Sequence, residues 1–96
     1  MDNEIILGSL SSDLKRVGLG LYRNSDQMAN RFLKEALKRK NEIDKNGLPQ
    51  YMVVLLGKIK KEISPDEALM YSTLLQNYVL KSSISSLVSA KAIALV

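Results

Sequence analysis

The sequence predicts an all-α protein, an antiparallel bundle of four helices in a single domain that spans residues 1–96. Apolar residues recur every three or four positions in four successive segments, the spacing that places them on one face of a helix. Turn and capping residues separate these segments. The apolar and charged fractions, 46% and 25%, are ordinary for a globular chain. The bundle would have a fifth helix if the last one broke near Ser82.

The first helix is expected from about Asn3 to Tyr22. Its apolar stripe consists of Ile6, Leu7, Leu10, Leu14, Val17 and Leu21. Gly18 and Gly20 weaken the last turn by up to ~1 kcal/mol each relative to alanine. They mark either an early helix end or a close crossing by another helix, and we expect the end to fray.

The second helix is expected to follow the turn and cap at Asn24-Ser25-Asp26 and to run to about Asp44. Its apolar stripe consists of Met28, Ala29, Phe32, Leu33, Ala36, Leu37 and Ile43. Gly47 is placed for a left-handed C-terminal cap of this helix, and Pro49 bars its continuation.

The third helix is expected to begin near Pro49, which suits the first helical position. Its apolar stripe consists of Met52, Leu55, Leu56, Ile59 and Ile63. The apolar run at residues 51–56 could instead form a buried strand, since short runs are ambiguous. Helical spacing beyond Leu56 favours the helix.

The fourth helix is expected to start at Ser64-Pro65-Asp66-Glu67, which matches a capping box. It carries two apolar stripes. The first consists of Tyr71, Leu74, Leu75 and Tyr78, and the second of Leu80, Ile84, Leu87, Val88 and Leu95. At 100° per residue the stripes are centred roughly 150° apart. Either the helix breaks near Lys81-Ser82-Ser83, or one long helix is covered on both sides.

The composition disfavours catalysis. The chain has no cysteine and no histidine, which removes disulfides, thiolate metal sites, the commonest general base and the commonest transition-metal ligand. Serines have no histidine to activate them. We therefore expect no enzymatic activity, no cofactor and no small-molecule substrate.

A paired carboxylate site is the remaining route to a metal. Glu35 and Glu42 lie seven positions apart on one face of the second helix. Arg31, Lys38 and Arg39 stand three or four positions from one or the other, the spacing of ordinary surface ion pairs. We favour the ion-pair interpretation and expect no metal site.

The chain is expected to be cytoplasmic. Its first residues are acidic where a secretory signal would be basic. No run reaches the 18 or so apolar residues that a membrane span needs, so no membrane role is expected.

The clustering of basic residues, nine of 14 within residues 31–61, suggests nucleic-acid binding as an alternative function. The candidate contacts are Arg31, Lys34, Lys38 and Lys45 on one face of the second helix, and Lys58, Lys60 and Lys61 near the end of the third. Phe32 lies on the apolar stripe, so no stacking platform for single strands is evident. The other interpretation is a solvated helix face with acidic residues interspersed.

The C-terminal third favours a protein-interaction module. From Ala68 onward the only charged residues are Lys81 and Lys91. Three amphipathic helices would struggle to cover a second apolar stripe, and exposed apolar surface of that length usually marks an interaction site. We therefore expect self-association through the C-terminal helix, as a homodimer, or docking on a larger protein partner. The candidate interface residues are Leu80, Ser82, Ile84, Ser86, Leu87, Val88, Ala90 and Leu95, in which the small residues allow close packing.

Overall fold

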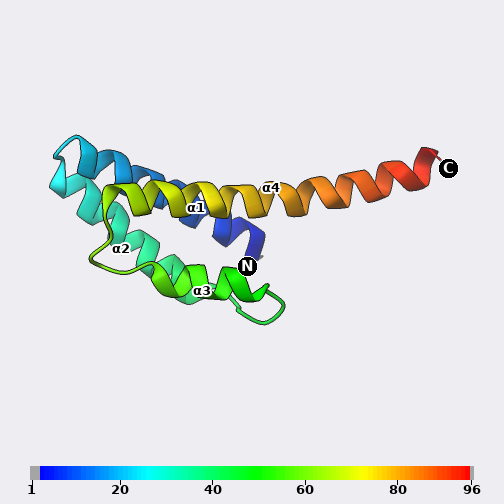
Figure 1. The fold of residues 1–96 in the computed structure, drawn as a ribbon, viewed down its shortest axis with the longest axis horizontal. Coiled ribbons are helices and arrows are strands. Elements are labelled where there is room, and N and C mark those ends of the chain that lie inside the picture. Colours follow the sequence, from blue (N-terminus) through cyan, green and yellow to red (C-terminus); the bar gives the residue numbers. More distant parts are fainter. Residues whose placement is uncertain (1–2, 96) are drawn as a thin grey trace.

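The protein consists of four helices, as predicted. The computed structural model describes the backbone of residues 3–95 and the side chains of residues 3–82. The helices are α1 (Asn3–Tyr22), α2 (Asp26–Glu42), α3 (Gln50–Lys58) and α4 (Pro65–Leu95). No strand occurs within residues 3–95, so the strand interpretation of residues 51–56 is wrong. α4 is one continuous helix through Ser82, and the fifth helix is not formed (Figure 1).

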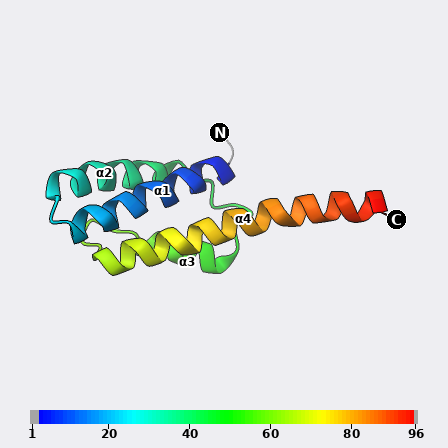
Figure 2. The same ribbon diagram turned by 90° about the horizontal axis from the view of Figure 1, so that it is seen from above.

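α1 packs against both α2 and α4 and runs antiparallel to each (Figures 1 and 2). Gly20 of α1 lies against Ala29 at the start of α2. At the other end of this pair, the Asn3 side chain donates to the Asp44 carbonyl at 2.7 Å and accepts from the Asp44 amide at 3.1 Å. Short α3 returns antiparallel to α2 and α4 and covers the core between them.

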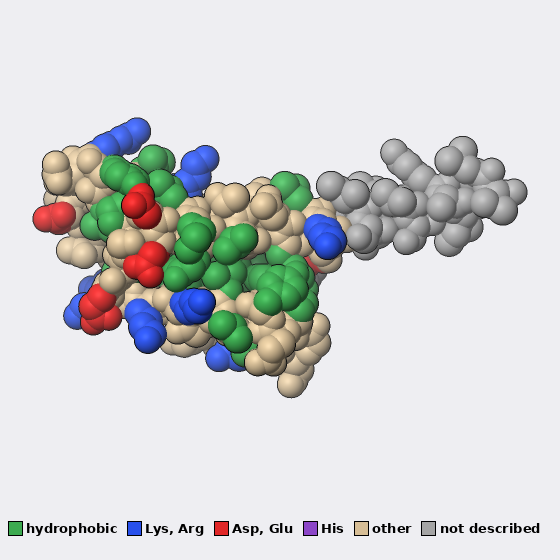
Figure 3. Space-filling model, viewed as in Figure 1, with side chains coloured by type: hydrophobic (Ala, Val, Ile, Leu, Met, Phe, Trp, Pro, Cys, Tyr) green, Lys and Arg blue, Asp and Glu red, His purple; other side chains and the backbone are tan. Residues whose placement is uncertain are grey.

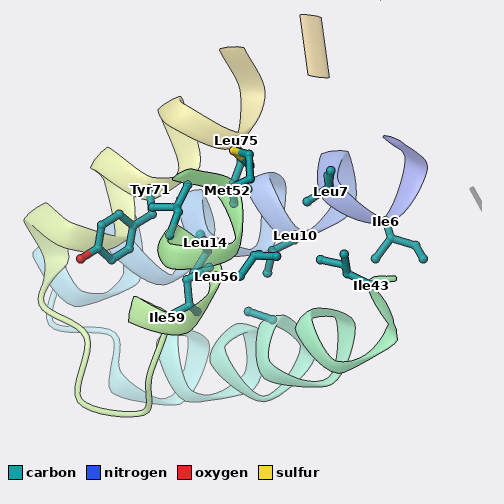
Figure 4. Packing of buried hydrophobic residues seen from close by; sticks show 12 residues of the cluster. Ile6, Leu7, Leu10, Leu14, Ile43, Met52, Leu56, Ile59, Tyr71 and Leu75 are labelled. Carbon is teal, nitrogen blue, oxygen red and sulfur yellow. The ribbon is translucent and has the colours of Figure 1, made fainter. Parts of the chain in front are cut away.

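The core contains apolar residues from all four helices and two residues that directly follow α2 and α3 (Figure 4). They are Ile6, Leu7, Leu10, Leu14, Ala36, Ile43, Met52, Leu55, Leu56, Ile59, Tyr71 and Leu75. All of them belong to the predicted apolar stripes. The prediction for α4 was wrong at Leu74, whose side chain is 45% exposed, while Ser72 is buried. The buried face of α4 is therefore rotated away from Leu74.

α1 and α4 cross closely because small residues face each other. The hydroxyl of Ser11 donates to the carbonyl of Ser72 at 2.8 Å, and the hydroxyl of Ser72 donates to the carbonyl of Ser11 at 2.7 Å. Toward the C-terminal end of α1, a Cβ on Gly18 would lie 2.6 Å from Leu69 Cγ and 3.2 Å from the Pro65 carbonyl oxygen. Both serines and Gly18 are buried.

The expectation that α1 frays is wrong. Asn24 takes a left-handed conformation with φ 56°. Its amide donates to the Leu21 carbonyl at 3.2 Å, and the Ser25 amide donates to the Gly20 carbonyl at 2.8 Å. These two bonds form a Schellman motif, which satisfies carbonyls that a helix end otherwise leaves free. The cap holds the last turn in place, and the two glycines mark the close crossings.

α2 ends at Glu42, two residues before the predicted end. Ile43 is extended, with φ −77° and ψ 128°, and its side chain is buried in the core. Gly47 is left-handed, with φ 86°, but it belongs to a turn in which the Leu48 amide donates to the Lys45 carbonyl. The prediction that Gly47 caps the helix is therefore wrong.

α3 ends at Lys58, so the last two residues of its predicted apolar stripe, Ile59 and Ile63, lie outside the helix. Ile59 is extended, with φ −80° and ψ 106°, which buries its side chain in the core. The Lys40 ammonium donates to the Ile59 carbonyl at 2.9 Å and so satisfies a group that the helix leaves unpaired. Gly57, a poor helix former, precedes this end.

The capping box at the start of α4 is confirmed. The Ser64 hydroxyl accepts from the Glu67 amide, and the Glu67 carboxylate accepts from the Ser64 amide, both at 3.1 Å. The amide and hydroxyl of Ser64 lower the pKa of Glu67 below its ordinary value, and a weaker contribution comes from the Tyr71 hydroxyl. This cap fixes where the longest helix begins.

Candidate interaction surfaces

The predicted interface on α4 begins with two residues that the structure describes. Leu80 is 47% exposed. Ser82 is half-buried, and its hydroxyl donates to the Glu4 carboxylate of α1 at 2.6 Å, so it contributes to packing within the subunit. The remaining candidates lie outside the residues whose side chains are described; they are Ile84, Ser86, Leu87, Val88, Ala90 and Leu95.

The register between helices shows how far along α4 the first turns of α1 and α3 reach. Glu4, in the first turn of α1, meets Ser82. In the first turn of α3, the Tyr51 ring packs edge-on against Tyr78 with centroids 6.3 Å apart. α1 has 20 residues and α4 has 31, which correspond to about 30 Å and about 46 Å of helix. α4 therefore continues as helix well past the residues that meet α1 and α3.

An apolar groove between α3 and α4 was not predicted. It has a volume of about 620 Å³. Four large apolar side chains line it while remaining strongly exposed: Tyr51 (61%), Val54 (47%), Met70 (51%) and Leu74 (45%). Lys58 and Lys81 also line the groove, and none of the carboxylates among the described residues does. Figure 3 shows the apolar side chains gathered across this face of the molecule.

One feature of the sequence, the apolar run at residues 51–56, indicates this groove in retrospect. Residues 51–56 are six consecutive apolar residues. A helix can turn only part of such a run toward one core, because successive residues are 100° apart. Met52, Leu55 and Leu56 are buried, which leaves Tyr51 and Val54 outside.

The predicted nucleic-acid contacts lie on α2, at the end of α3 and in the loops that follow these two helices. Arg31 and Lys34 of α2 and Lys61 of the loop before α4 line one depression of about 670 Å³. Lys58 instead lies at the α3–α4 groove. Lys38 is exposed on α2.

Lys45 and Lys60 belong to a second basic group, centred on Lys40. Burial lowers the pKa of Lys40, and the positive charges of Lys45 and Lys60 lower it further.

The ring of Phe32 lies under two guanidinium groups, those of Arg16 at 5.1 Å and Arg31 at 5.8 Å. Phe32 is half-buried.

The carboxylates show a different pairing from the one that sequence spacing indicated. The Nε of Arg39 donates to the buried carboxylate of Asp13 on α1 at 2.6 Å, and Glu35 and Glu42 act on Arg39 only as weaker charges. This hydrogen bond, followed by the charge of Asp13, raises the pKa of Arg39. The ion pair links α1 to α2. Within the described residues, no group of three or more carboxylates is arranged to hold a metal ion.

Within the described residues, none of the helices combines the length and apolarity needed to cross a bilayer. Comparisons with known protein families, curated proteins and solved structures find no match for this sequence.

Proposed function

We propose that the protein is a non-catalytic helical assembly module that self-associates through the C-terminal half of α4. The observation that carries the proposal is the register of the bundle. Among the residues whose side chains the structure describes, α3 meets α4 at Tyr78 and the first turn of α1 meets it at Ser82, and α4 is helical to Leu95. An isolated helical segment of this length is marginal in water, so packing against another surface would stabilise it.

The sequence of this segment suits packing against a second copy. It contributes the apolar stripe from Leu80 to Leu95 and small residues at positions 86 and 90 that permit close approach. Each leucine, isoleucine or valine that becomes fully covered contributes about 1.5–3 kcal/mol. A five-residue stripe from each of two copies can therefore offset the roughly 4–15 kcal/mol that association costs. A twofold dimer is the commonest symmetric solution.

The mass in solution tests the proposal. Light scattering on the purified chain at high micromolar concentration should give twice the 10.7 kDa of one copy. Leu87→Glu should give the single-copy mass, because it places a charge in the apolar stripe. Ser85→Glu adds the same charge on a face of an ideal helix that carries none of the candidate interface residues, and it should leave the dimer intact.

A truncation locates the interface. Removing the residues after Lys81 should abolish association and preserve most of the circular dichroism of the bundle. A native chain that stays monomeric at high micromolar concentration would contradict self-association. A truncated chain that still dimerises would show that the interface lies elsewhere.

A second candidate function, nucleic-acid binding, is favoured by the convergence of Arg31, Lys34 and Lys61 on one depression. Such a cluster would neutralise phosphates and release counterions. Binding to DNA or RNA should then fall steeply with salt and be lost in the Lys34→Glu, Lys38→Glu double variant. Absence of binding at low salt would eliminate this function.

A further inference from the structure

We propose that the groove between α3 and α4 binds an amphipathic helix of a partner protein, one that carries acidic side chains beside its apolar face. The groove lies before Ser82 along α4 and is therefore separate from the self-association segment. Tyr51, Val54, Met70 and Leu74 expose contiguous apolar surface there. Scattered exposed apolar residues need no explanation, but a contiguous concave patch usually marks a binding site.

The dimensions of the groove match a helix. On α4 its wall runs from Met70 to Lys81, and on α3 it runs from Tyr51 to Lys58. These stretches correspond to about 16 Å and about 10 Å of helix. A ligand helix that inserts side chains at positions i, i+4 and i+7 spans about 10 Å, which fits between two such walls.

The residue types in the groove suit recognition of a protein. Tyrosine supplies large contact area at little cost in conformational entropy and is enriched among residues that dominate binding energy. Met70 is unbranched and can adapt to the shape of an inserted side chain. The floor is formed by buried core residues, among them Met52 and Tyr71, so it is rigid enough to hold its shape.

Charge complementarity identifies the partner as acidic and argues against a second copy. Lys58 and Lys81 are the charged residues that line the groove. Two copies that met groove to groove would bring lysines toward lysines, and the α4 sequence after Glu67 carries no carboxylate to pair with them. The acidic residues of α2 in a second copy cannot pair with these lysines as part of a docked helix, because the apolar face of α2 is already packed in the core of its own subunit at Ala36. An external helix with glutamates beside its apolar stripe satisfies both lysines.

A synthetic helical peptide provides the probe. It carries leucine at positions i, i+4 and i+7 with glutamates on either side, and a matched peptide carries lysines instead. Fluorescence anisotropy with the full-length chain should show micromolar binding of the glutamate peptide and about tenfold weaker binding of the lysine peptide, since two exposed ion pairs are exchanged for repulsion. The Lys58→Glu, Lys81→Glu double variant should reverse this preference.

Two matched variants locate the binding site. Leu74→Asp places a charge inside the groove and should abolish binding of the glutamate peptide. Ile5→Asp introduces the same charge at an apolar side chain on α1 that is 58% exposed and does not line the groove, and it should leave binding unchanged. Circular dichroism should show that both variants retain their helices, since neither side chain is buried.

Four results would overturn the proposal: no binding of the glutamate peptide, equal binding of both peptides, binding that survives Leu74→Asp, or conversion of a homodimer to monomers by Leu74→Asp. The last result would assign the groove to a second copy of the chain. The two proposals are tested by separate measurements. Leu87→Glu tests self-association through the mass in solution and does not alter the groove, so failure of the self-association proposal is distinguishable from failure of this one.

Discussion

A pair of glycine-to-alanine substitutions in α1 measures how closely α1 and α4 approach. Gly8 and Gly18 both lie inside the same helix, so alanine gains the same helix propensity at each. Their surroundings differ. A Cβ at Gly8 would have no atom within 4 Å, whereas a Cβ at Gly18 would lie 2.6 Å from Leu69 Cγ and 3.2 Å from the carbonyl oxygen of Pro65.

The expected free energies follow from this difference. Gly8→Ala should raise the free energy of unfolding by about 0.5–1 kcal/mol through propensity and reduced freedom of the unfolded chain. Gly18→Ala has the same gain but forces atoms into a packed crossing, which costs about 1–3 kcal/mol. Leu69 can rotate away from the new methyl group, but the backbone carbonyl cannot. Gly18→Ala should therefore be less stable than Gly8→Ala by about 1–3 kcal/mol.

Urea denaturation followed by circular dichroism measures this difference. The protein concentration must be equal for all samples, because association makes stability depend on concentration. With a slope of about 1–3 kcal/mol per molar urea, the midpoints of the two variants should differ by about 1 M. Equal stabilisation by both alanines would refute the close crossing of α1 and α4 at Gly18.

Three further substitutions test other contacts. Ser11→Ala removes one of two reciprocal hydroxyl–carbonyl bonds between α1 and α4 and should lower the free energy of unfolding by about 1 kcal/mol; no change in urea midpoint would contradict that bond. Arg39→Met leaves the Asp13 carboxylate buried with only the longer contact to Arg16, at 4.0 Å, whereas Asp13→Asn leaves an arginine that can turn to solvent. Arg39→Met should therefore be the more destabilising in the same assay, and the opposite order would contradict the pairing. The lowered pKa of Glu67 contributes stability that is present above its ordinary value of 4.5 and is lost as the pH falls through the folded-state value. Glu67→Gln should therefore reduce the fall in melting temperature on acidification, and an unchanged fall would exclude this contribution.

The positions of the helices could be predicted from local chemistry. The start of α4 follows from Ser64 and Glu67, whose reciprocal bonds need only residues three positions apart. The bounds of α1 follow from periodicity and hold as predicted. The predictions of the C-terminal ends of α2 and α3 were less accurate, because these ends depend on tertiary contacts. Ile43 and Ile59 leave the helical conformation, and their side chains are buried in the core.

The surfaces could be predicted only in part. Spacing assigned Leu74 to the core, but the face that α4 buries is determined by the small residues opposite it, including Ser11 and Gly18 on α1, and not by the apolar stripe alone. The α3–α4 groove likewise depends on how two helices meet. Arg39 was assigned to carboxylates of its own helix, but a buried carboxylate on a neighbouring helix is a better partner than an exposed one, because less water competes for it.

Hydrogen exchange at residues 83–95, followed as a function of protein concentration, tests self-association through α4 most directly. If a second copy covers this segment, its amides should become more protected as the concentration rises. Amides of the exposed loop at residues 44–47, which can exchange without global unfolding, should stay constant as an internal reference. Protection that does not change with concentration would show that the segment is covered within one subunit. Absence of protection at any concentration would show that nothing packs against it, and either result would contradict assembly through α4.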